Sequence, residues 1–406
     1  MFGHHCEENM KYFHTPVSGW EFRPTNSNKQ KANLMNRTRL MFSAAALLFA
    51  SAALPALAGN IVLGGSAPLS GAQAEFGQSQ IDGAQLYFDQ INEKGGIKGN
   101  KVVFRPLDDR ADPRQGTLVA QQFCDDSAVI GVIGHMNSGV TMPALDIYSE
   151  CGMPQVVPAT NPELMRRGFK TVVRPVANDF VQGALPATFV TEKLGLKNAV
   201  LVHDKTVFGQ GIAGVFKDNF EARGGKISGT FGTNPEDVDF SALIASIKLK
   251  NPDVVYMGAG MPQLALFLRQ MREQGLRAQF IGPDIGFTVD FITQAGAAAA
   301  EGALMTFQLP PYDSSPELKD FADRHQARFG RAPGPYASLG FANAQVMAAA
   351  VEQAKTLDRE GVLAKLHGVK INTLVGPVAF DENGENITAP MYLYIVKNGK
   401  FELIRQ

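Results

Sequence analysis

Strand-like and helix-like segments alternate along almost the whole chain after residue 59, and this order constrains the fold more than any other feature. Short apolar runs, such as NIVLGGSA at 60–67 and AVIGVI at 128–133, are followed by segments with apolar residues at helical spacing, such as 78–93. Continuous apolar runs are typical of parallel strands that are buried on both faces. The β-α-β-α order therefore predicts a doubly wound parallel sheet with helices on both sides.

The pattern restarts after Arg174-Pro175, which predicts two similar α/β lobes. The predicted strands are 60–67, 102–107, 128–133 and 155–157, then 199–203, 226–230, 253–257 and 279–281. The predicted helices are 78–93, 112–124, 140–151, 209–223, 241–250, 262–274, 316–329 and 336–355. A strand at 374–380 and a hairpin of 392–396 and 401–404 around Lys397-Asn398-Gly399-Lys400 follow.

Residues 35–58 have the organisation of a secretory signal peptide. Arg37 and Arg39 precede the apolar run 40–54, and Ala56-Leu57-Ala58 is a small-x-small cleavage pattern. We expect cleavage after Ala58. The alternative is a transmembrane anchor, for which the apolar run is short.

Residues 1–34 are polar, irregular and oddly placed before a signal peptide. Because Met35 would give a compact start, MNRTRL, we predict that 1–34 is a non-native upstream extension. The alternative is a long basic region belonging to the signal peptide itself.

Composition and missing motifs exclude several classes of protein. With 45% hydrophobic and 19% charged residues and a formal net charge of −1, the chain is an ordinary globular protein without the basic field of a nucleic-acid binder. It has no H-E-x-x-H, G-x-S-x-G or Walker A motif, and the four histidines after the leader are scattered, so we expect neither catalysis nor a metal site. Cys124 and Cys151 are either a disulfide or two separate buried thiols.

One nucleotide-binding motif matches by its letters. Gly209-Gln210-Gly211-Ile212-Ala213-Gly214 reads G-x-G-x-x-G between a predicted strand and a helix, and an NAD-type oxidoreductase is therefore one alternative function. However, five residues (204–208) separate the predicted strand 199–203 from the first glycine, whereas in a dinucleotide site the glycine follows almost at once. The competing interpretation is a helix start that needs close backbone packing.

Three turns after predicted strands carry polar side chains, at 134–139, 158–163 and 282–284. Ligands of open α/β sheets bind beyond the carboxyl ends of strands, near helix N-termini that attract anions. Ser138 and Thr160 would offer neutral donors in one lobe, and Asp284 an anion in the other. A zwitterionic amino acid between the lobes would satisfy both, although Ser and Asp also serve as ordinary helix caps.

Beyond residue 59 the chain resembles the leucine/isoleucine/valine-binding proteins of bacterial branched-chain amino acid ABC transporters. The segments that carry this resemblance are KGGIKGNK at 94–101, DDRADP at 108–113, IGHMNSG at 133–139, PATNPEL at 158–164, VHDKTVFGQG at 202–211, FIGPD at 280–284 and VGPVAFDENG at 375–384. The resemblance implies a type I periplasmic binding protein fold with a three-segment hinge that closes on ligand. The implied lobes are 59–177 plus 308–384 and 178–307 plus 385–406.

The resemblance also implies roles for single residues. Ser138 and Thr160 would hold the ligand carboxylate, a backbone carbonyl near Pro158 or Ala159 would accept from the ammonium, and Asp284 would bind the ammonium. The further candidate ligand-binding residues are Met136, Phe76 and Phe208, of which the two phenylalanines are alternatively core aromatics.

Several positions depart from the family pattern. Phe208 stands where a tyrosine is common, and Gly260 lies near a position often held by an aromatic residue. Arg110 and Asn137 stand where the family has its own disulfide, so a bridge between Cys124 and Cys151 would be a different one.

The function that the resemblance implies is a monomeric periplasmic binding protein without cofactor or metal. It would deliver a branched-chain aliphatic amino acid to an inner-membrane ABC permease. The alternatives are another amino acid, an amide or an aromatic acid as ligand, or a role as a ligand sensor.

Overall fold

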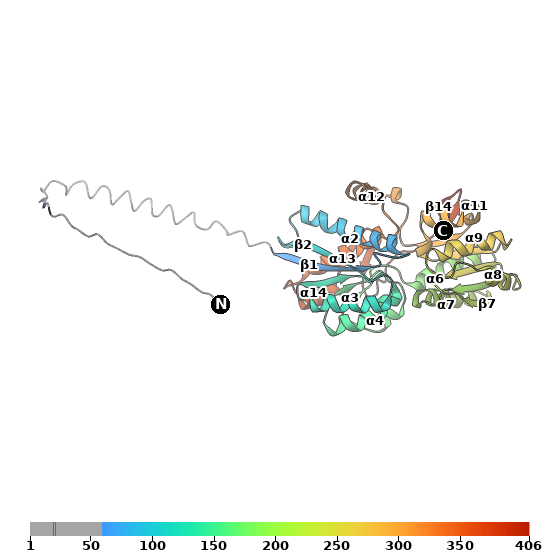
Figure 1. Ribbon diagram of the computed structural model, residues 1–406, viewed down its shortest axis with the longest axis horizontal. Helices are drawn as coiled ribbons and strands as arrows, with labels where there is room; N and C mark the ends of the chain where they lie inside the picture. Colours follow the sequence, from blue (N-terminus) through green and yellow to red (C-terminus); the bar gives the residue numbers. More distant parts are fainter. Residues whose placement is uncertain (1–18, 20, 22–58, 406) are drawn as a thin grey trace, which may run out of the picture. The chain divides into compact units, whose positions relative to one another are not determined.

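The computed structural model describes residues 19, 21 and 59–405 (Figure 1). The predicted extension 1–34 and signal peptide 35–58 therefore lie outside the described residues, apart from those two positions. Ala58–Gln406 is one compact unit. In this unit the described strands form a five-stranded, a seven-stranded and a two-stranded sheet.

The five-stranded sheet belongs to the first lobe and is parallel throughout, in the order β2-β1-β3-β4-β5. Its strands are β1 (Asn60–Ala67), β2 (Lys101–Asp108), β3 (Val129–Ile133), β4 (Gln155–Val156) and β5 (Val172–Val173). The helices of this lobe are α2 (Ala74–Glu93), α3 (Pro113–Asp125), α4 (Ser138–Glu150), α5 (Glu163–Arg166), α12 (Pro316–Phe329), α13 (Ala337–Gln353) and α14 (Arg359–Leu366). The late helix α13 packs against α2 and β3, so a distant part of the chain completes the first lobe (Figure 1).

The seven-stranded sheet forms the second lobe, in the order β14-β13-β10-β9-β8-β6-β7. Its strands are β6 (Asn198–His203), β7 (Lys226–Gly232), β8 (Val254–Gly258), β9 (Gln279–Gly282), β10 (Leu304–Phe307), β13 (Tyr392–Lys397) and β14 (Lys400–Leu403). The strands from β7 to β10 are parallel, and β13 pairs antiparallel with both β10 and β14.

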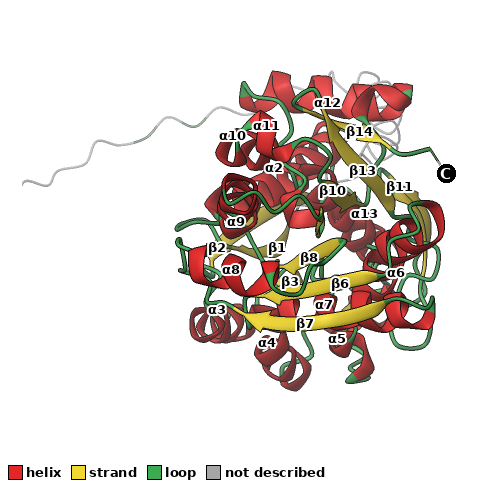
Figure 2. Cartoon of the chain, turned by 90° about the vertical axis from the view of Figure 1, so that its right-hand side faces the viewer, coloured by secondary structure: helices red, strands yellow, loops and turns green. Residues whose placement is uncertain are grey.

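Helices cover both faces of this second sheet (Figure 2). One face packs on α6 (Asp179–Thr188) and α7 (Val207–Ala222) through Val254, Tyr256 and Ile281. The other packs on α8 (Ser241–Lys248), α9 (Gln263–Glu273) and α10 (Val289–Ala295). The second face of β8 and β9 is formed by Val255, Met257 and Phe280. The alternation of these apolar side chains explains why the strands read as unbroken hydrophobic runs.

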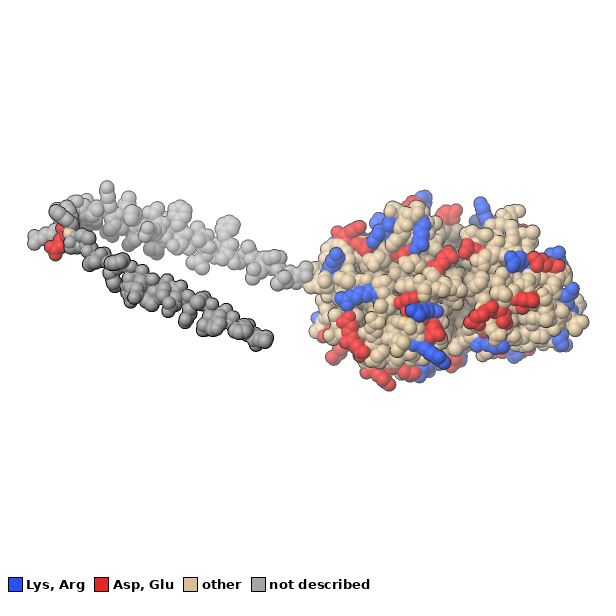
Figure 3. Space-filling view, viewed as in Figure 1, with Lys and Arg blue, Asp and Glu red and all other residues tan. Residues whose placement is uncertain are grey.

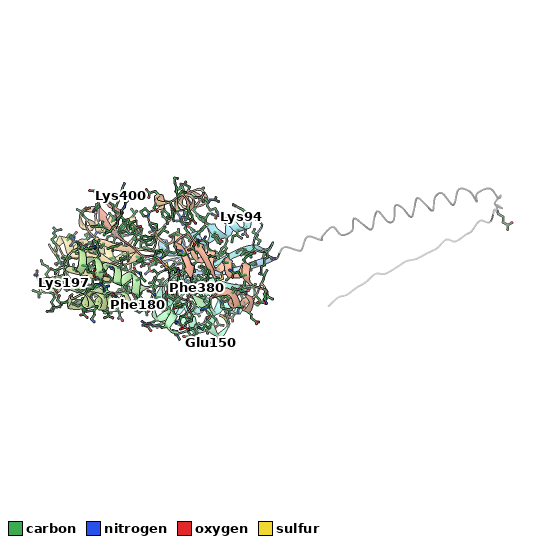
Figure 4. All side chains as sticks on the ribbon, turned by 180° about the vertical axis from the view of Figure 1, so that it is seen from behind. Lys94, Glu150, Phe180, Lys197, Phe380 and Lys400 are labelled. Atoms are coloured by element: carbon green, nitrogen blue, oxygen red, sulfur yellow. A yellow bond between two sulfur atoms is a disulfide. The ribbon has the colours of Figure 1, made fainter. Side chains whose placement is uncertain are left out.

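The chain crosses between the lobes three times: after β5, after β10 and after the small sheet of β11 (Lys370–Thr373) and β12 (Gly376–Ala379). The first and third crossings touch, because Arg174 forms an isolated parallel bridge with Glu385. Figure 4 labels Phe180 and Phe380, which lie toward the middle of the described unit. The predicted architecture of two α/β lobes with a three-segment hinge is confirmed, whereas the residue boundaries at 177/178, 307/308 and 384/385 stay a prediction.

Most predicted elements lie within a few residues of their predicted bounds, but α2 starts four residues earlier than predicted, at Ala74. Gly77 permits this start, because a Cβ at that position would come within 1.9 Å of the Pro68 carbonyl oxygen. The elements that the sequence analysis missed are α5, α6, β5, β10, β11, α10, α14, the π-helical turn Phe189–Lys193 and the short helix Ala297–Ala300.

The two cysteines after the leader form a disulfide, which confirms the first of the two alternatives. Cys124 lies in the last turn of α3, and Cys151 follows α4. The bridge therefore joins the C-terminal ends of two helices that cover the same face of the first sheet.

Candidate functional site

A cavity of about 30 Å³ lies where the two lobes meet. Its lining residues are Met136, Asn137, Ser138, Pro158, Ala159, Thr160, Phe208, Asp284, Ile285 and Tyr336. The first six follow β3 and β4 in the first lobe, and three of the others come from the second. A cavity needs roughly 10–15 Å³ of such volume to hold one water molecule, so this cavity is nearly closed, and a larger ligand requires the lobes to move apart.

Seven of the eight candidate ligand-binding residues line this cavity, and Phe76 does not. Phe76 is buried one layer behind, where its ring meets Tyr336 edge-to-face with centroids 5.7 Å apart. Sequence reasoning missed Tyr336, which precedes α13 and reaches the cavity from the second segment of the first lobe. The ligand-binding roles of these residues stay predictions.

The wall of the first lobe is built on the start of α4. Ser138 is the first residue of this helix, is almost fully buried, and accepts a hydrogen bond from the Asn161 backbone N–H at 3.3 Å. The first N–H groups of a helix have no partner within the helix and carry a partial positive charge. This wall can therefore bind an anionic group such as a carboxylate.

A buried polar network holds the turn that precedes Ser138. The His135 Nδ1 atom lies 2.9 Å from Asp109 Oδ2 and 2.7 Å from Ser66 Oγ. The Gln155 side chain donates to the Gly134 carbonyl at 2.7 Å. Because these groups are buried and hydrogen-bonded to one another, the turn has few alternative positions.

The second turn, 158–161, is held by Arg174. The guanidinium Nη1 donates to the carbonyl oxygens of Ala159 at 2.9 Å and Asn161 at 2.8 Å. The other edge of the guanidinium forms a bidentate pair with Glu385 from the third crossing. Asn161 in turn donates from Nδ2 to the Val207 carbonyl at 2.9 Å, which closes the cleft beside the cavity.

The wall of the second lobe carries Asp284, which is only 2% exposed. Its carboxylate accepts from the Ile285 N–H at 3.0 Å, from Gln308 Nε2 at 3.4 Å and from the Tyr336 hydroxyl at 3.4 Å. Burial raises the pKa of Asp284 to about 6, although these hydrogen bonds oppose the shift. An ammonium group in the cavity would stabilise the charged carboxylate.

A second buried acid stands behind Asp284 and was missed in the sequence. Asp179 is the first residue of α6 and is 0% exposed. Gln182 joins the two acids, since its Nε2 donates to Asp179 Oδ1 at 3.4 Å and its Oε1 accepts from the Asp284 N–H at 2.7 Å. Burial raises the pKa of Asp179 to about 7. The Thr160 side chain opposes this shift, and the nearby charge of Asp284 adds to it. In sequence, an acid in the first turn of a helix is an ordinary feature, so no signal separates this one.

The two walls thus differ in charge, and apolar side chains lie between them. Hydroxyl and backbone N–H groups face the cavity from one lobe, a carboxylate faces it from the other, and Met136, Phe208 and Ile285 supply the apolar surface. This arrangement can hold a molecule with an anionic end, a cationic end and a small apolar body.

On the outer face shown in Figure 3, Lys and Arg side chains are interspersed with Asp and Glu.

The G-x-G-x-x-G segment is part of helix α7 in the structure. A Cβ at Gly209 would come within 2.1 Å of Asp204 Oδ1, and a Cβ at Gly211 within 2.5 Å of Asn161 Nδ2. Gly209 therefore permits close packing within the second lobe, and Gly211 permits close packing across the cleft, as the competing interpretation expected.

Residues 19, 21 and 59–405 contain neither a metal-binding cluster nor a membrane-spanning helix. These residues contain no group of three or more His, Cys, Asp or Glu side chains that could hold a metal ion. No helix among them has the length and apolar character needed to cross a membrane.

Comparison with known proteins gives consistent matches over this whole unit. A family model described as periplasmic binding protein matches residues 60–400. The leucine-specific-binding protein of Salmonella typhimurium is 34% identical over 331 residues, which are 81% of this chain and 89% of that protein.

Two solved structures have a similar fold. A leucine binding protein from Thermotoga maritima matches with a TM-score of 0.78 and 28% identity, over 85% of this chain and 98% of that one. The branched-chain amino acid transporter substrate binding protein of Streptococcus pneumoniae, in complex with isoleucine, matches with a TM-score of 0.78 and 25% identity, over 86% of this chain and 100% of that one. Since these matches extend over both lobes, the chain belongs to the periplasmic binding protein family, among its leucine/isoleucine/valine-binding members.

Proposed function

We propose that this chain is a periplasmic solute-binding protein that captures a branched-chain aliphatic amino acid between its lobes. One observation carries the proposal: the cavity has hydroxyl and N–H donors on one wall and a buried carboxylate on the other. The two charged ends of an α-amino acid match these walls. The leucine-specific relative and the isoleucine complex support the choice of ligand class.

Each part of the ligand has a proposed partner. The start of α4, Ser138 and Thr160 hold the carboxylate, whereas the Ala159 carbonyl and Asp284 hold the ammonium. Charge-assisted hydrogen bonds of this kind contribute about 1.5–3 kcal/mol each.

The aliphatic side chain of the ligand packs on apolar groups. Met136, Pro158 and Phe208 provide this contact, and Phe76 supports it indirectly by fixing the Tyr336 ring. The exclusion of water by these side chains strengthens the polar contacts at the other end of the ligand.

The proposed partner is the permease of an inner-membrane ABC transporter, to which the monomeric protein delivers its ligand after export and cleavage behind Ala58. No catalytic step is proposed, because binding and release complete this task. The lobes that close on the ligand are 59–177 plus 308–384 and 178–307 plus 385–406.

Two departures from the family pattern favour a second candidate, a larger or aromatic amino acid. Phe208 has no hydroxyl, and a Cβ at Gly260 would meet only Gln73 Nε2 within 4 Å, at 3.4 Å. Gly260 does not line the cavity as it stands, so a longer ligand side chain would reach this space only when the lobes move apart.

A thermal-shift screen of the twenty amino acids, with aromatic acids and amides added, tests the proposal. A ligand at 100-fold over its Kd raises the unfolding free energy by about 2.7 kcal/mol, which gives a clear increase in Tm. We expect leucine, isoleucine or valine to give the largest increase. A shift with phenylalanine alone would favour the second candidate, and a shift with no amino acid at all would refute both.

A further inference from the structure

Three buried polar atoms around the proposed ammonium site lack a hydrogen-bond partner among the described residues. These atoms are Asp179 Oδ2, Gln308 Oε1 and the Tyr256 hydroxyl. Unpartnered buried polar atoms are uncommon because each costs about 1–3 kcal/mol, more when the group is charged. The unpartnered carboxylate oxygen is therefore the feature that most needs an explanation.

Asp179 and Asp284 lie close enough to influence each other. A single amide, that of Gln182, reaches the side chain of one and the backbone of the other. Asp179 does not line the cavity, whereas Asp284 does. Two carboxylates in one buried region repel each other, and protonation of one of them removes this repulsion.

The charged groups on the surrounding elements do not neutralise this pair of acids. Arg174 is the nearest cation, but its guanidinium is committed to Glu385 and to two backbone carbonyls. Glu385 opposes the effect of Arg174 on Asp179. From β8 and from the start of α13, the phenols of Tyr256 and Tyr336 face the pair, and burial raises the pKa of both, so they stay neutral.

We propose that Asp179 is a positioning residue that holds a proton while the cleft is unliganded and gives it up to solvent when the ligand ammonium enters. The inference rests on the proposed function, because it needs a cationic group beside Asp284. Only the O–H bond of the carboxyl breaks, and the proton leaves to buffer. The ammonium then supplies the positive charge that lets Asp179 and Asp284 be ionised together.

Protons and amino acid therefore compete for the same buried pair. Above the pKa of about 7 no proton has to leave, and the affinity is highest. Below it, each pH unit weakens binding by up to about tenfold for one displaced proton. Between about pH 8 and pH 6 we expect the Kd to rise roughly tenfold.

Isothermal titration with L-leucine over about pH 5.5–8, in buffers of low and high ionisation enthalpy, measures both the Kd and the number of protons released. Neither charged group of leucine titrates in this range. In the unmodified protein we expect release of about half a proton or more near pH 6.5. In Asp179→Asn the Kd should change by no more than about twofold from pH 8 to pH 6, because only Asp284, with its pKa of about 6, then gains a proton in this range.

Asp253→Asn is the matched control, since Asp253 is exposed, lies outside the cavity and accepts hydrogen bonds from the Lys197 and Asn198 N–H groups. This variant should keep the pH dependence of the unmodified protein. A Kd independent of pH and no proton release in the unmodified protein overturn the inference whether or not Asp179→Asn folds. An unaltered pH profile in a folded Asp179→Asn also overturns it. If no amino acid binds at any pH, the proposed function fails as well.

Discussion

Replacing Asp284 with asparagine should change affinity and stability in opposite directions. The folded protein raises the pKa of this carboxyl from 3.8 to about 6, so the fold binds the proton more tightly than the unfolded chain does. The unfolding free energy therefore falls as the pH rises from about 4 to 6, and above this window the charged carboxylate costs up to about 3 kcal/mol. Asp284→Asn removes that cost at neutral pH and should stabilise the unliganded protein.

The same substitution removes the negative charge that we propose binds the ligand ammonium. The loss of a charge-assisted hydrogen bond, about 1.5–3 kcal/mol, corresponds to a Kd that is roughly 10- to 150-fold weaker. Urea denaturation at about pH 7 and pH 4 measures the stability, and titration with leucine measures the affinity. The gain in stability should be present at the higher pH and absent at the lower one.

Two results would contradict this reasoning. Lower stability at neutral pH together with lower affinity would mean that Asp284 serves the fold. An unchanged Kd would mean that the ammonium binds elsewhere. Asp218→Asn is the control, because Asp218 lies exposed on α7 and should alter neither quantity.

Two further predictions concern the disulfide and the contact between the lobes. Replacing both Cys124 and Cys151 with alanine should lower the unfolding free energy by about 3.5 kcal/mol, the chain-entropy value for a separation of 27 residues, with the leucine Kd unchanged. Urea denaturation measures this loss, and a loss below about 1 kcal/mol would show that the bridge adds little. Asn161→Ala removes the hydrogen bond to the Val207 carbonyl and should weaken leucine binding about two- to tenfold. An unaltered Kd in this variant would show that the contact does not help to close the cleft.

The two sheets were predictable because their parallel strands are buried on both faces. β3 and β8 are unbroken apolar runs in the sequence and are fully buried in the structure. The hairpin of β13 and β14 was also predictable, since Asn398 and Gly399 both adopt the positive φ that a two-residue turn requires.

The elements that the sequence analysis missed contain residues that disfavour a helix, or are too short to show a clear hydrophobic pattern. Helix α6 contains Gly183 and Pro186, and the strand β10 is only four residues long. Tertiary packing on the seven-stranded sheet decides both cases, and this packing has no counterpart in a local pattern.

The candidate site was predictable only where it follows strand ends in order along the chain. Ser138, Thr160 and Asp284 all stand directly behind predicted strands. Tyr336 and Asp179 could not be found in this way, because they reach the site only through the crossings of the chain between the lobes. Their burial is a property of the assembled cleft rather than of the local sequence.

The ion pair of Arg174 and Glu385 links the crossings between the lobes to the wall of the cavity. Bending at the crossing strands must move the Ala159 carbonyl as well, because the Arg174 guanidinium is hydrogen-bonded both to Glu385 and to this carbonyl. A natural variant at Glu385, more than two hundred positions away from Ala159 in sequence, should therefore alter selectivity without changing any lining side chain. A redesign of the cavity for a new ligand should therefore keep the ion pair of Arg174 and Glu385 and vary the apolar lining residues Met136, Phe208 and Ile285 instead.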